Sequence, residues 1–443
     1  MTFLDLNLNA ALLSALADAD YTNPTTIQHK VYPIAMSGRD VCGIAQTGTG
    51  KTFAYLLPCL QQWKYNKEKY AQILILVPTR ELVAQVVLAV QELTKYMSVT
   101  TIGVYGGVNI NTQFTQIASG VDVLVATPGR LFDLIMNGAI KTKNIKKLVI
   151  DEMDEMLKLG FRTQIKSIVD LIPAKRQNLL FSATITPDVE SLMEIFFNNP
   201  IKVEASPTGT PVENIMQQAF AVPNFYTKVN LLTLLLAEND SITKLLIFVA
   251  TKKLADELYL QLQPLYPLTC GVIHSNKEQN HRFNTVKQFQ EGNYKFIIAT
   301  DIVARGIDIS EVSHVINFDI PAVPENYIHR IGRTGRADKK GIAYSFYTPL
   351  EATNLSAIEA LMKYKVPLLP LPTHLAISEQ LTDDEVPKVY MKTYQVRLPK
   401  KEEVGPAFHP KSAKNSKVNF LVSKKERMMK KYGRPKTRGQ KKK

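Results

Sequence analysis

A glycine-rich segment, AQTGTGKT (45–52), has the residue types and the spacing of a loop that binds phosphate. It follows a short apolar run and precedes FAYLLPCLQQW, which favours a helix. In that setting the backbone N–H groups from Thr47 onward would surround a phosphate, the Lys51 amine would reach the β/γ-phosphates and the Thr52 hydroxyl would hold Mg²⁺. Ala45 stands where the common pattern has glycine. The segment predicts a nucleotide site formed by Ala45, Gln46, Thr47, Gly48, Thr49, Gly50, Lys51 and Thr52.

Two acidic residues, Asp151 and Glu152, follow the apolar run KLVI. At the carboxyl end of a strand, the first acid of such a pair can bind Mg²⁺ and the second can orient or deprotonate an attacking water. In isolation a pair of this kind is more often part of a solvated loop. With a phosphate loop upstream we interpret it as catalytic, so Thr52 and Asp151 are the expected metal ligands.

The choice of base is indicated by TNPTTIQ (22–28), which places Gln28 ahead of the phosphate loop. One carboxamide can donate to adenine N7 while accepting from N6, a match that guanine does not offer at O6. A surface glutamine is the alternative interpretation. The residue favours ATP over GTP.

A second group of charged residues, HRIGRTGR (329–336), lies in the other half of the chain, which has no phosphate loop of its own. Arginines supplied across an interface stabilise the charge on a transferring phosphoryl group. An exposed basic turn is the alternative. Upstream, ATDIVARGIDI (299–309) places Thr300, Arg305 and Asp308 after a strand, where α/β folds carry ligand groups. We expect the second half to complete a site that the first half begins.

These motifs follow short apolar runs that alternate with helical patterns. Strand, helix, strand is typical of a parallel sheet with helices on both faces, so the fold class is predicted as α/β. The expected strands are 41–44, 73–77, 121–126, 148–150 and 179–184 in the first half, and 244–251, 271–274, 294–300, 314–318 and 342–347 in the second.

A Ser/Pro/Gly/Thr stretch, SPTGTP (206–211), separates the two halves and indicates a linker. After about Pro370 the apolar runs fade and lysines accumulate. The predicted organisation is a first domain over 1–205, a linker over 206–215, a second domain over 216–370 and a basic, largely disordered extension over 371–443.

The net charge of +14 is concentrated at the C-terminus, because Lys400 to Lys443 contain 16 Lys/Arg and three Glu, or +13. A basic tail on a nearly neutral body suggests a polyanion as partner, and a solubilising end is the alternative. Within VNFLVSKKERMMKKYG (418–433), a short amphipathic helix could instead dock a protein through Phe420, Leu421, Met428 and Met429.

The sequence contains no run of 18 apolar residues, and MTFLDLNLNA has neither a basic nor an apolar leader. A cytoplasmic protein with no membrane partner is therefore expected. Its three cysteines, Cys42, Cys59 and Cys270, lack the spacing of a disulfide framework or a zinc site and are expected to be buried hydrophobes.

Taken together, the motifs resemble those of the bacterial DEAD-box ATP-dependent RNA helicases, in that family's order and spacing. The resemblance covers roughly Thr2 to Pro370 and implies two tandem RecA-like domains. It rests on Phe3 with PTTIQ (24–28), AQTGTGKT (45–52), PTREL (78–82), GG (106–107), TPGR (127–130), DEMD (151–154), SAT (182–184), IF (247–248), QNHR (279–282), ATDIVARGID (299–308) and HRIGRTGR (329–336).

The resemblance also implies roles for individual residues. The adenosine would be bound by Phe3, Thr25, Gln28 and Asp308. Glu152 would be the catalytic base, and Arg333 and Arg336 would be arginine fingers. Nucleotide and RNA would be coupled through Asp154, Ser182, Thr184 and His329. RNA phosphates and 2′-hydroxyls would be bound by Thr79, Arg80, Gly107, Thr127, Gly129 and Arg130 in the first domain and by Arg282 and Thr300 in the second.

The expected activity is local unwinding of short RNA duplexes by a core that binds single-stranded RNA without reading its sequence. Met153 replaces the alanine of the name-giving motif, and its bulk could alter the coupling of hydrolysis to unwinding. Family members with a similar tail suggest ribosome assembly or RNA turnover, with ribosomal particles or decay machinery as partners. Two alternatives stay open: an ATP-gated RNA clamp that hardly unwinds, and a DNA helicase of the wider superfamily.

Overall fold

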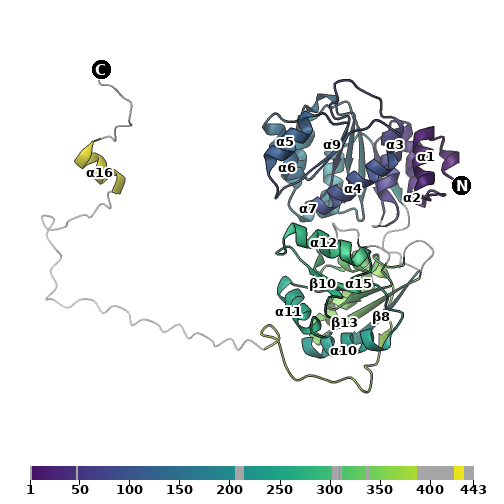
Figure 1. Ribbon diagram of the computed structural model, residues 1–443, viewed down its shortest axis with the longest axis vertical. Helices are drawn as coiled ribbons and strands as arrows, with labels where there is room; N and C mark the ends of the chain where they lie inside the picture. The colour runs from purple at the N-terminus through teal and green to yellow at the C-terminus, as the bar shows by residue number, and fades with distance from the viewer. Residues whose placement is uncertain are drawn as a thin grey trace, which may run out of the picture. The chain divides into compact units, whose positions relative to one another are not determined.

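Two parallel sheets, each of seven strands, organise the part of the chain up to Val386 (Figure 1). The computed structural model describes residues 2–45, 48–204, 214–301, 309, 312–335, 340–386 and 424–433. Five residues singled out for the site, Gln46, Thr47, Arg305, Asp308 and Arg336, lie outside this set, as does most of the expected linker.

The first sheet has the strand order β3-β4-β2-β5-β6-β1-β7, and every neighbouring pair is parallel. Parallel neighbours require crossover connections, and here helices supply them. The strands are β1 (Val41–Ile44), β2 (Ile73–Leu76), β3 (Thr101–Val104), β4 (Val123–Ala126), β5 (Lys147–Ile150), β6 (Gln177–Ser182) and β7 (Ile201–Glu204).

Helices pack on both faces of this sheet because its central strands are apolar on both sides. In β2, Ile73 and Ile75 belong to one buried cluster, whereas Leu74 and Leu76 belong to the other. The first cluster includes side chains of η1 (Phe3–Leu6), α1 (Ala10–Asp18), α2 (Thr26–Met36), α3 (Lys51–Gln61) and α4 (Arg80–Leu93). The second includes α5 (Ile110–Ala118), α6 (Pro128–Met136), α7 (Met153–Lys158), α8 (Arg162–Leu171) and α9 (Pro187–Phe196), and a short turn, η2 (Thr142–Asn144), precedes β5.

The second sheet has the order β10-β11-β9-β12-β13-β8-β14, again with parallel neighbours throughout. Its strands are β8 (Ile215–Ala221), β9 (Leu245–Phe248), β10 (Cys270–Ile273), β11 (Phe296–Ala299), β12 (His314–Asn317), β13 (Gly341–Tyr347) and β14 (Leu368–Leu369). One face is covered by α10 (Phe225–Glu238) and α11 (Lys252–Leu262). The other is covered by α12 (Gln279–Gln290), α14 (Pro324–Ile331) and α15 (Ala352–Met362), with η3 (Pro349–Glu351) before α15. The predicted α/β class with two parallel sheets is confirmed.

The segment 371–386 continues the second domain beyond its last strand. Leu371 and Leu375 pack against the apolar cluster under α10. At the N-terminus of that helix, the Glu385 carboxylate accepts a hydrogen bond of 2.7 Å from the backbone N–H of Phe225. A carboxylate there satisfies a free N–H group and complements the helix dipole, so this segment contributes to the stability of α10.

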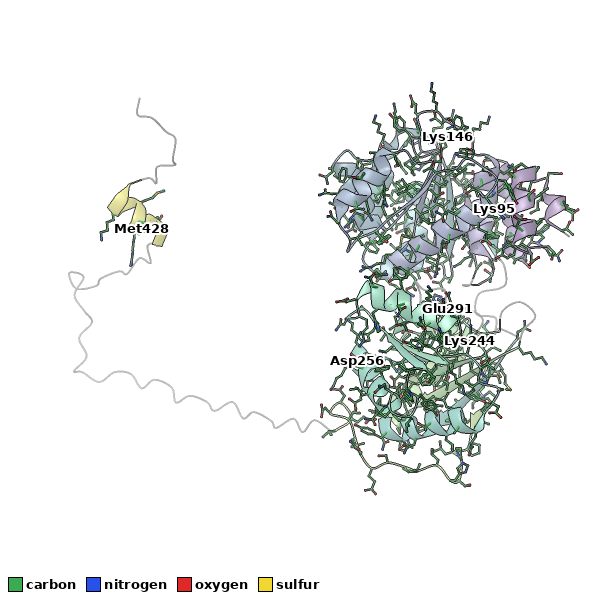
Figure 2. The ribbon with its side chains drawn as sticks, viewed as in Figure 1. Lys95, Lys146, Lys244, Asp256, Glu291 and Met428 are labelled. Atoms are coloured by element: carbon green, nitrogen blue, oxygen red, sulfur yellow. The ribbon has the colours of Figure 1, made fainter. Side chains whose placement is uncertain are left out.

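The described part of the C-terminal extension is a basic helix, α16 (Lys424–Tyr432). Met428 and Met429, expected from the sequence on a short amphipathic helix, lie on it with about half of their surface exposed. Figure 2 labels Met428. Within the described ranges, the chain forms no helix with the length and apolar character needed to cross a membrane. The three cysteines are buried and unbridged, as predicted.

Candidate active site

The glycines of the phosphate loop have backbone conformations that few other residues adopt. Gly48 and Gly50 have φ angles of 88° and 89°, and Lys51 begins α3 directly afterwards. A Cβ atom on Gly50 would lie 2.5 Å from Nε2 of Gln28 and 2.8 Å from Oγ1 of Thr25. The loop therefore packs tightly against the start of α2, and only glycine fits at this position.

Gln28 and Thr25, both expected near adenine, hold that contact in place. Gln28 Oε1 accepts a hydrogen bond of 2.9 Å from the Thr25 backbone N–H, which caps α2. Its Nε2 donates to the Gly50 carbonyl at 3.1 Å. Phe3 is buried in the apolar cluster of the first domain. Gln28 thus ties α2 to the phosphate loop, a link that the sequence does not indicate.

Lys51 carries a buried amine whose Nζ has no hydrogen-bond partner among the described residues. Its positive charge acts on Asp151, Glu152 and Asp154, which follow β5 at the same edge of the sheet. A buried cation left without a hydrogen-bond acceptor is costly. The group is therefore arranged for an anionic ligand, as a phosphate-binding lysine requires.

Asp151 is fully buried and held from two sides. Its Oδ2 accepts a hydrogen bond of 3.1 Å from the Tyr55 hydroxyl, and its Oδ1 accepts one of 2.9 Å from the Glu152 backbone N–H. Burial raises the pKa of Asp151, while the charge of Lys51 opposes the rise. With Thr52, the second residue of α3, Asp151 would supply the hard oxygen atoms that Mg²⁺ prefers.

Glu152 adopts a left-handed backbone conformation, with φ at 52°. Such a conformation is uncommon for a residue with a side chain and is often found at active sites. The carboxylate is buried, and its Oε2 has no hydrogen-bond partner among the described residues. Burial raises the pKa of Glu152 to about 7, against the opposing charges of Lys51 and Arg333. An acid with this pKa can accept a proton near neutral pH.

Asp154 joins the site to the SAT segment. Its Oδ2 accepts a hydrogen bond of 2.9 Å from the Thr184 hydroxyl, and the Ser182 hydroxyl donates to the Thr184 carbonyl at 2.8 Å. Burial alone would raise the pKa of Asp154, but the charges of His329 and Lys51 lower it. Met153 is completely buried in the second apolar cluster, so its extra bulk is accommodated inside the first domain.

The second domain contributes to the same site through α14 and the turn after it. His329 Nδ1 lies 4.0 Å from Oε1 of Glu155, and both side chains are buried. Arg333 is 3% exposed and is near enough to Glu152 to act on its pKa. Of the two predicted arginine fingers, Arg333 therefore lies within electrostatic reach of Glu152, whereas Arg336 lies outside the described residues, as does Asp308.

The predicted RNA-binding residues of the first domain gather at the carboxyl ends of β2, β3 and β4. Thr79 caps α4 by accepting a hydrogen bond from Leu82, and the Arg80 guanidinium packs on Gly107. Arg130 donates to the Val108 carbonyl at 2.9 Å and to Gln113 Oε1 at 2.7 Å. Thr127 and Gly129 lie at the start of α6.

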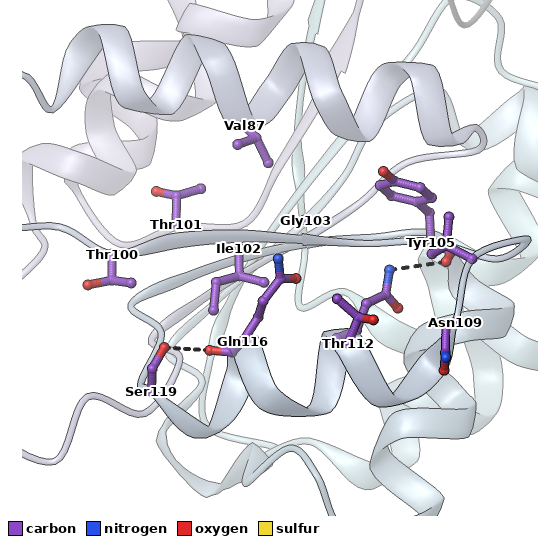
Figure 3. A pocket seen from close by; sticks show the side chains of 12 residues that line it. Val87, Thr100, Thr101, Ile102, Gly103, Tyr105, Asn109, Thr112, Gln116 and Ser119 are labelled. Carbon is purple, nitrogen blue, oxygen red and sulfur yellow. Dashed lines mark hydrogen bonds between the residues drawn. The ribbon is translucent and has the colours of Figure 1, made fainter. Parts of the chain in front are cut away.

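A cavity of about 520 Å³ borders this surface between α4, the edge strand β3 and α5 (Figure 3). Gln113 belongs to its wall and donates to the Tyr105 carbonyl at 3.3 Å. Because Gln113 also accepts a hydrogen bond from Arg130, the wall of the cavity contacts one of the predicted RNA-binding residues.

In the second domain, Thr300 follows β11 and Arg282 lies in the first turn of α12. Arg282 is buried and forms an ion pair with Glu81 of the first domain, with 2.8 Å between Nη1 and Oε1. Arg282, the predicted RNA-binding arginine of the second domain, thus lies at the start of α4. Its partner Glu81 directly follows the predicted RNA-binding residue Arg80 in the sequence.

Three contributors were missed from the sequence: Tyr55, Glu81 and Glu155. Tyr55 lies one helical turn after Lys51, on the same face of α3. This spacing could have indicated from the sequence that Tyr55 lies near the phosphate site. Glu81 belongs to the PTREL motif, but nothing in the neighbouring sequence indicates which residue it pairs with. Glu155 directly follows DEMD, and its proximity to His329 depends on the second domain.

The described residues therefore combine a phosphate loop, a buried amine, a carboxylate with a pKa near 7 and an arginine from another domain. This set fits a nucleoside triphosphate with Mg²⁺, because the buried Lys51 amine has no acceptor among the described residues and the carboxylates beside it offer oxygen ligands to a cation. The arrangement can hydrolyse a phosphoanhydride.

Residues 25–192 match the family model of the DEAD/DEAH box helicases, and residues 227–338 match the helicase conserved C-terminal domain. The chain is 38% identical to the DEAD-box ATP-dependent RNA helicase RhpA of Helicobacter pylori, over 84% of this chain and 75% of the relative. It is 40% identical to the DEAD-box ATP-dependent RNA helicase CshA of Bacillus cereus, over 84% and 70%.

Solved structures agree with these matches. S. cerevisiae Dbp5 bound to RNA and ADP BeF3 aligns with a TM-score of 0.74 and 31% identity, covering 83% of this chain and 95% of that one. A DEAD box protein from the hyperthermophile Methanococcus jannaschii aligns with a TM-score of 0.52 and 32% identity, over 83% and 99%. The chain therefore belongs to the family of DEAD-box ATP-dependent RNA helicases, with two RecA-like domains.

Proposed function

We propose that the chain hydrolyses ATP at the site formed by Lys51, Asp151 and Glu152 and completed by Arg333, and that it uses the cycle to separate short RNA duplexes. The buried Lys51 amine, which has no acceptor among the described residues, carries this proposal together with the carboxylates beside it. Such an amine binds phosphate without first breaking an ion pair.

In the proposed cycle Glu152 accepts the proton of the attacking water, because its pKa of about 7 keeps a large fraction ionised at neutral pH. Lys51 and Arg333 stabilise the charge that develops on the phosphoryl oxygens. Mg²⁺, held by Thr52 and Asp151, would neutralise phosphate charge when bound. Adenine recognition by Gln28, Thr25 and Phe3, and ribose recognition by Asp308, belong to the same proposal.

Communication with RNA would pass through Asp154, whose bonds to the SAT segment and proximity to His329 connect the two domains. Arg80, Gly107 and Arg130 in the first domain, with Arg282 and Thr300 in the second, would bind the backbone of one RNA strand. Contacts to phosphates and 2′-hydroxyls fit strand geometry, so no sequence preference is expected of the core.

In the cell we propose a cytoplasmic role in ribosome assembly or RNA turnover. The basis is the C-terminal extension, where α16 places Lys430 and Lys431 beside the exposed Met428 and Met429. A helix with this composition suits RNA, a ribosomal particle or the RNA-decay machinery as partner.

The test uses the full chain with a short duplex that has either an RNA or a DNA loading strand. We expect ATP turnover to rise with single-stranded RNA, and the duplex to separate only with ATP and the RNA strand. Equal stimulation by DNA would contradict the RNA assignment. RNA-stimulated turnover without any strand separation would support the ATP-gated clamp instead.

A further inference from the structure

A buried cluster outside the nucleotide site joins the two sheet domains. Glu81 in the first turn of α4 and Arg282 in the first turn of α12 form an ion pair of 2.8 Å, and less than a tenth of either side chain is exposed. Gln279 donates from Nε2 to the same Glu81 oxygen at 3.1 Å. Arg282 donates from Nη2 to Gln279 Oε1. The three side chains thus form a closed ring of hydrogen bonds across the domains.

The ring leaves one group of Arg282 unused. Its two terminal nitrogens are occupied by Glu81 and Gln279, whereas the buried Nε has no hydrogen-bond partner among the described residues. Arg80, which packs on Gly107, is close enough for its charge to act on Arg282. Arg282 therefore lies within a group of cations expected to bind the RNA backbone.

The charge balance of the ring depends on Glu81. Burial lowers the pKa of the Arg282 guanidinium and the charge of Arg80 lowers it further, whereas Glu81 opposes both effects. Without the carboxylate, bringing the domains together would bury an uncompensated cation. With it, the ion pair forms only when α4 and α12 meet, so its free energy favours the joined domains.

We propose that Glu81 is a positioning residue for RNA binding: it holds Arg282 and Gln279 of the second domain against the RNA-binding segment of the first. The inference rests on the proposed function. Beyond that function, it assigns Glu81 a role in coupling: the contact that joins the two domains also positions a residue that binds the RNA strand.

The experiment measures RNA-stimulated ATP turnover against RNA concentration for the full chain and for Glu81→Gln. Removing one partner of a buried charge pair should raise the KM for RNA by about 30-fold or more. The kcat at saturating RNA and the turnover without RNA should change little, because neither depends on how readily the strand is captured. Glu92→Gln removes a charge from an exposed position of the same helix and should leave the KM unchanged or slightly lower.

A double variant separates positioning from general stability. If Glu81 acts through Arg282, adding Glu81→Gln to Arg282→Gln should cause no further loss of RNA affinity. Additive losses would overturn the proposal, as would a KM for RNA that is lower in Glu81→Gln than in the parent, because Glu81 would then compete with RNA for Arg282. A parent without RNA-stimulated turnover would refute the proposed function itself. A stimulated parent with an unchanged Glu81→Gln would refute only this inference.

Discussion

Glu152→Gln should stop turnover and at the same time stabilise the protein at alkaline pH. The folded protein raises the pKa of this carboxyl from 4.5 to about 7, mainly through burial, so folding favours the protonated form. Ionisation therefore destabilises the fold: the parent loses stability as the pH rises from about 4.5 to about 7 and has lost the whole contribution by pH 8. Glutamine has nearly the same size and carries no charge.

The expected magnitude follows from the shift. At about 1.4 kcal/mol per pKa unit, the ionised carboxylate costs about 3 kcal/mol at pH 8 and almost nothing at pH 4. In a domain of this size the melting temperature of Glu152→Gln should exceed that of the parent by about 5 to 10 °C at pH 8, and by little at pH 4. Turnover should fall by about 100-fold or more at pH 8, where the parent carboxylate is ionised, because the general base is gone.

Thermal melting of the unliganded full chain at the two pH values, with Glu194→Gln on the exposed side of α9 as control, tests the argument. Melting temperatures of the Glu152→Gln variant that match the parent at pH 8 would refute it. An equal gain at pH 4 and pH 8 would also refute it, since the effect would then not arise from ionisation. In the parent, ATP turnover should decline as the pH falls through about 7.

Three further predictions use other parts of the chain. Gly50→Ala should lose ATP affinity and melt lower than Gly160→Ala, because both glycines have positive φ but only the first Cβ would meet neighbours within 4 Å; equal melting temperatures would contradict the packing argument. Arg333→Ala should lose RNA-stimulated hydrolysis with little change in ATP affinity, measured by turnover and nucleotide titration, since its charge reaches Glu152 from the second domain. A chain ending at Pro399 lacks +13 of the net charge, so its RNA affinity should depend less steeply on salt. The slope of the logarithm of the binding constant against the logarithm of the salt concentration should fall by about 0.7 for each lost phosphate contact. Identical slopes for the two chains would exclude RNA binding by the tail.

The sequence predicts the strands that are buried along their whole length well and several partly exposed strands poorly. The runs at 41–44, 73–77 and 244–251 contain β1, β2 and β9, whose residues are completely buried between helices. The edge strand β10 was predicted at 271–274, because its residues are buried. The edge strands β3, β7 and β14 were not anticipated, because β3 and β7 are only partly buried and β14 has two residues. In β8 two glutamines, Gln217 and Gln218, interrupt the apolar run although the strand lies inside the sheet.

The site, too, contains residues that could be predicted from the sequence and contacts that could not. Lys51, Asp151 and Glu152 lie at predictable places because a phosphate loop and an acidic strand end belong to one edge of a parallel sheet. The Glu81–Arg282 pair could not be predicted, since it depends on how two helices from different domains meet. Likewise, the bond from Gln28 to the Gly50 carbonyl depends on side-chain packing rather than on spacing along the chain.

The contacts of residues 371–386 determine where this helicase core can be joined to foreign sequences. A chimera fused at 370 would strip Leu371 and Leu375 from the α10 face and leave the backbone N–H of Phe225 without its carboxylate. A chimera fused after Val386 keeps all of these contacts. Chimeras joined after Val386 would therefore differ only in the chemistry of their tails. Chimeras joined at 370 would also differ in the stability of α10 and would expose apolar surface on it, so an effect of the tail could not be separated from these changes.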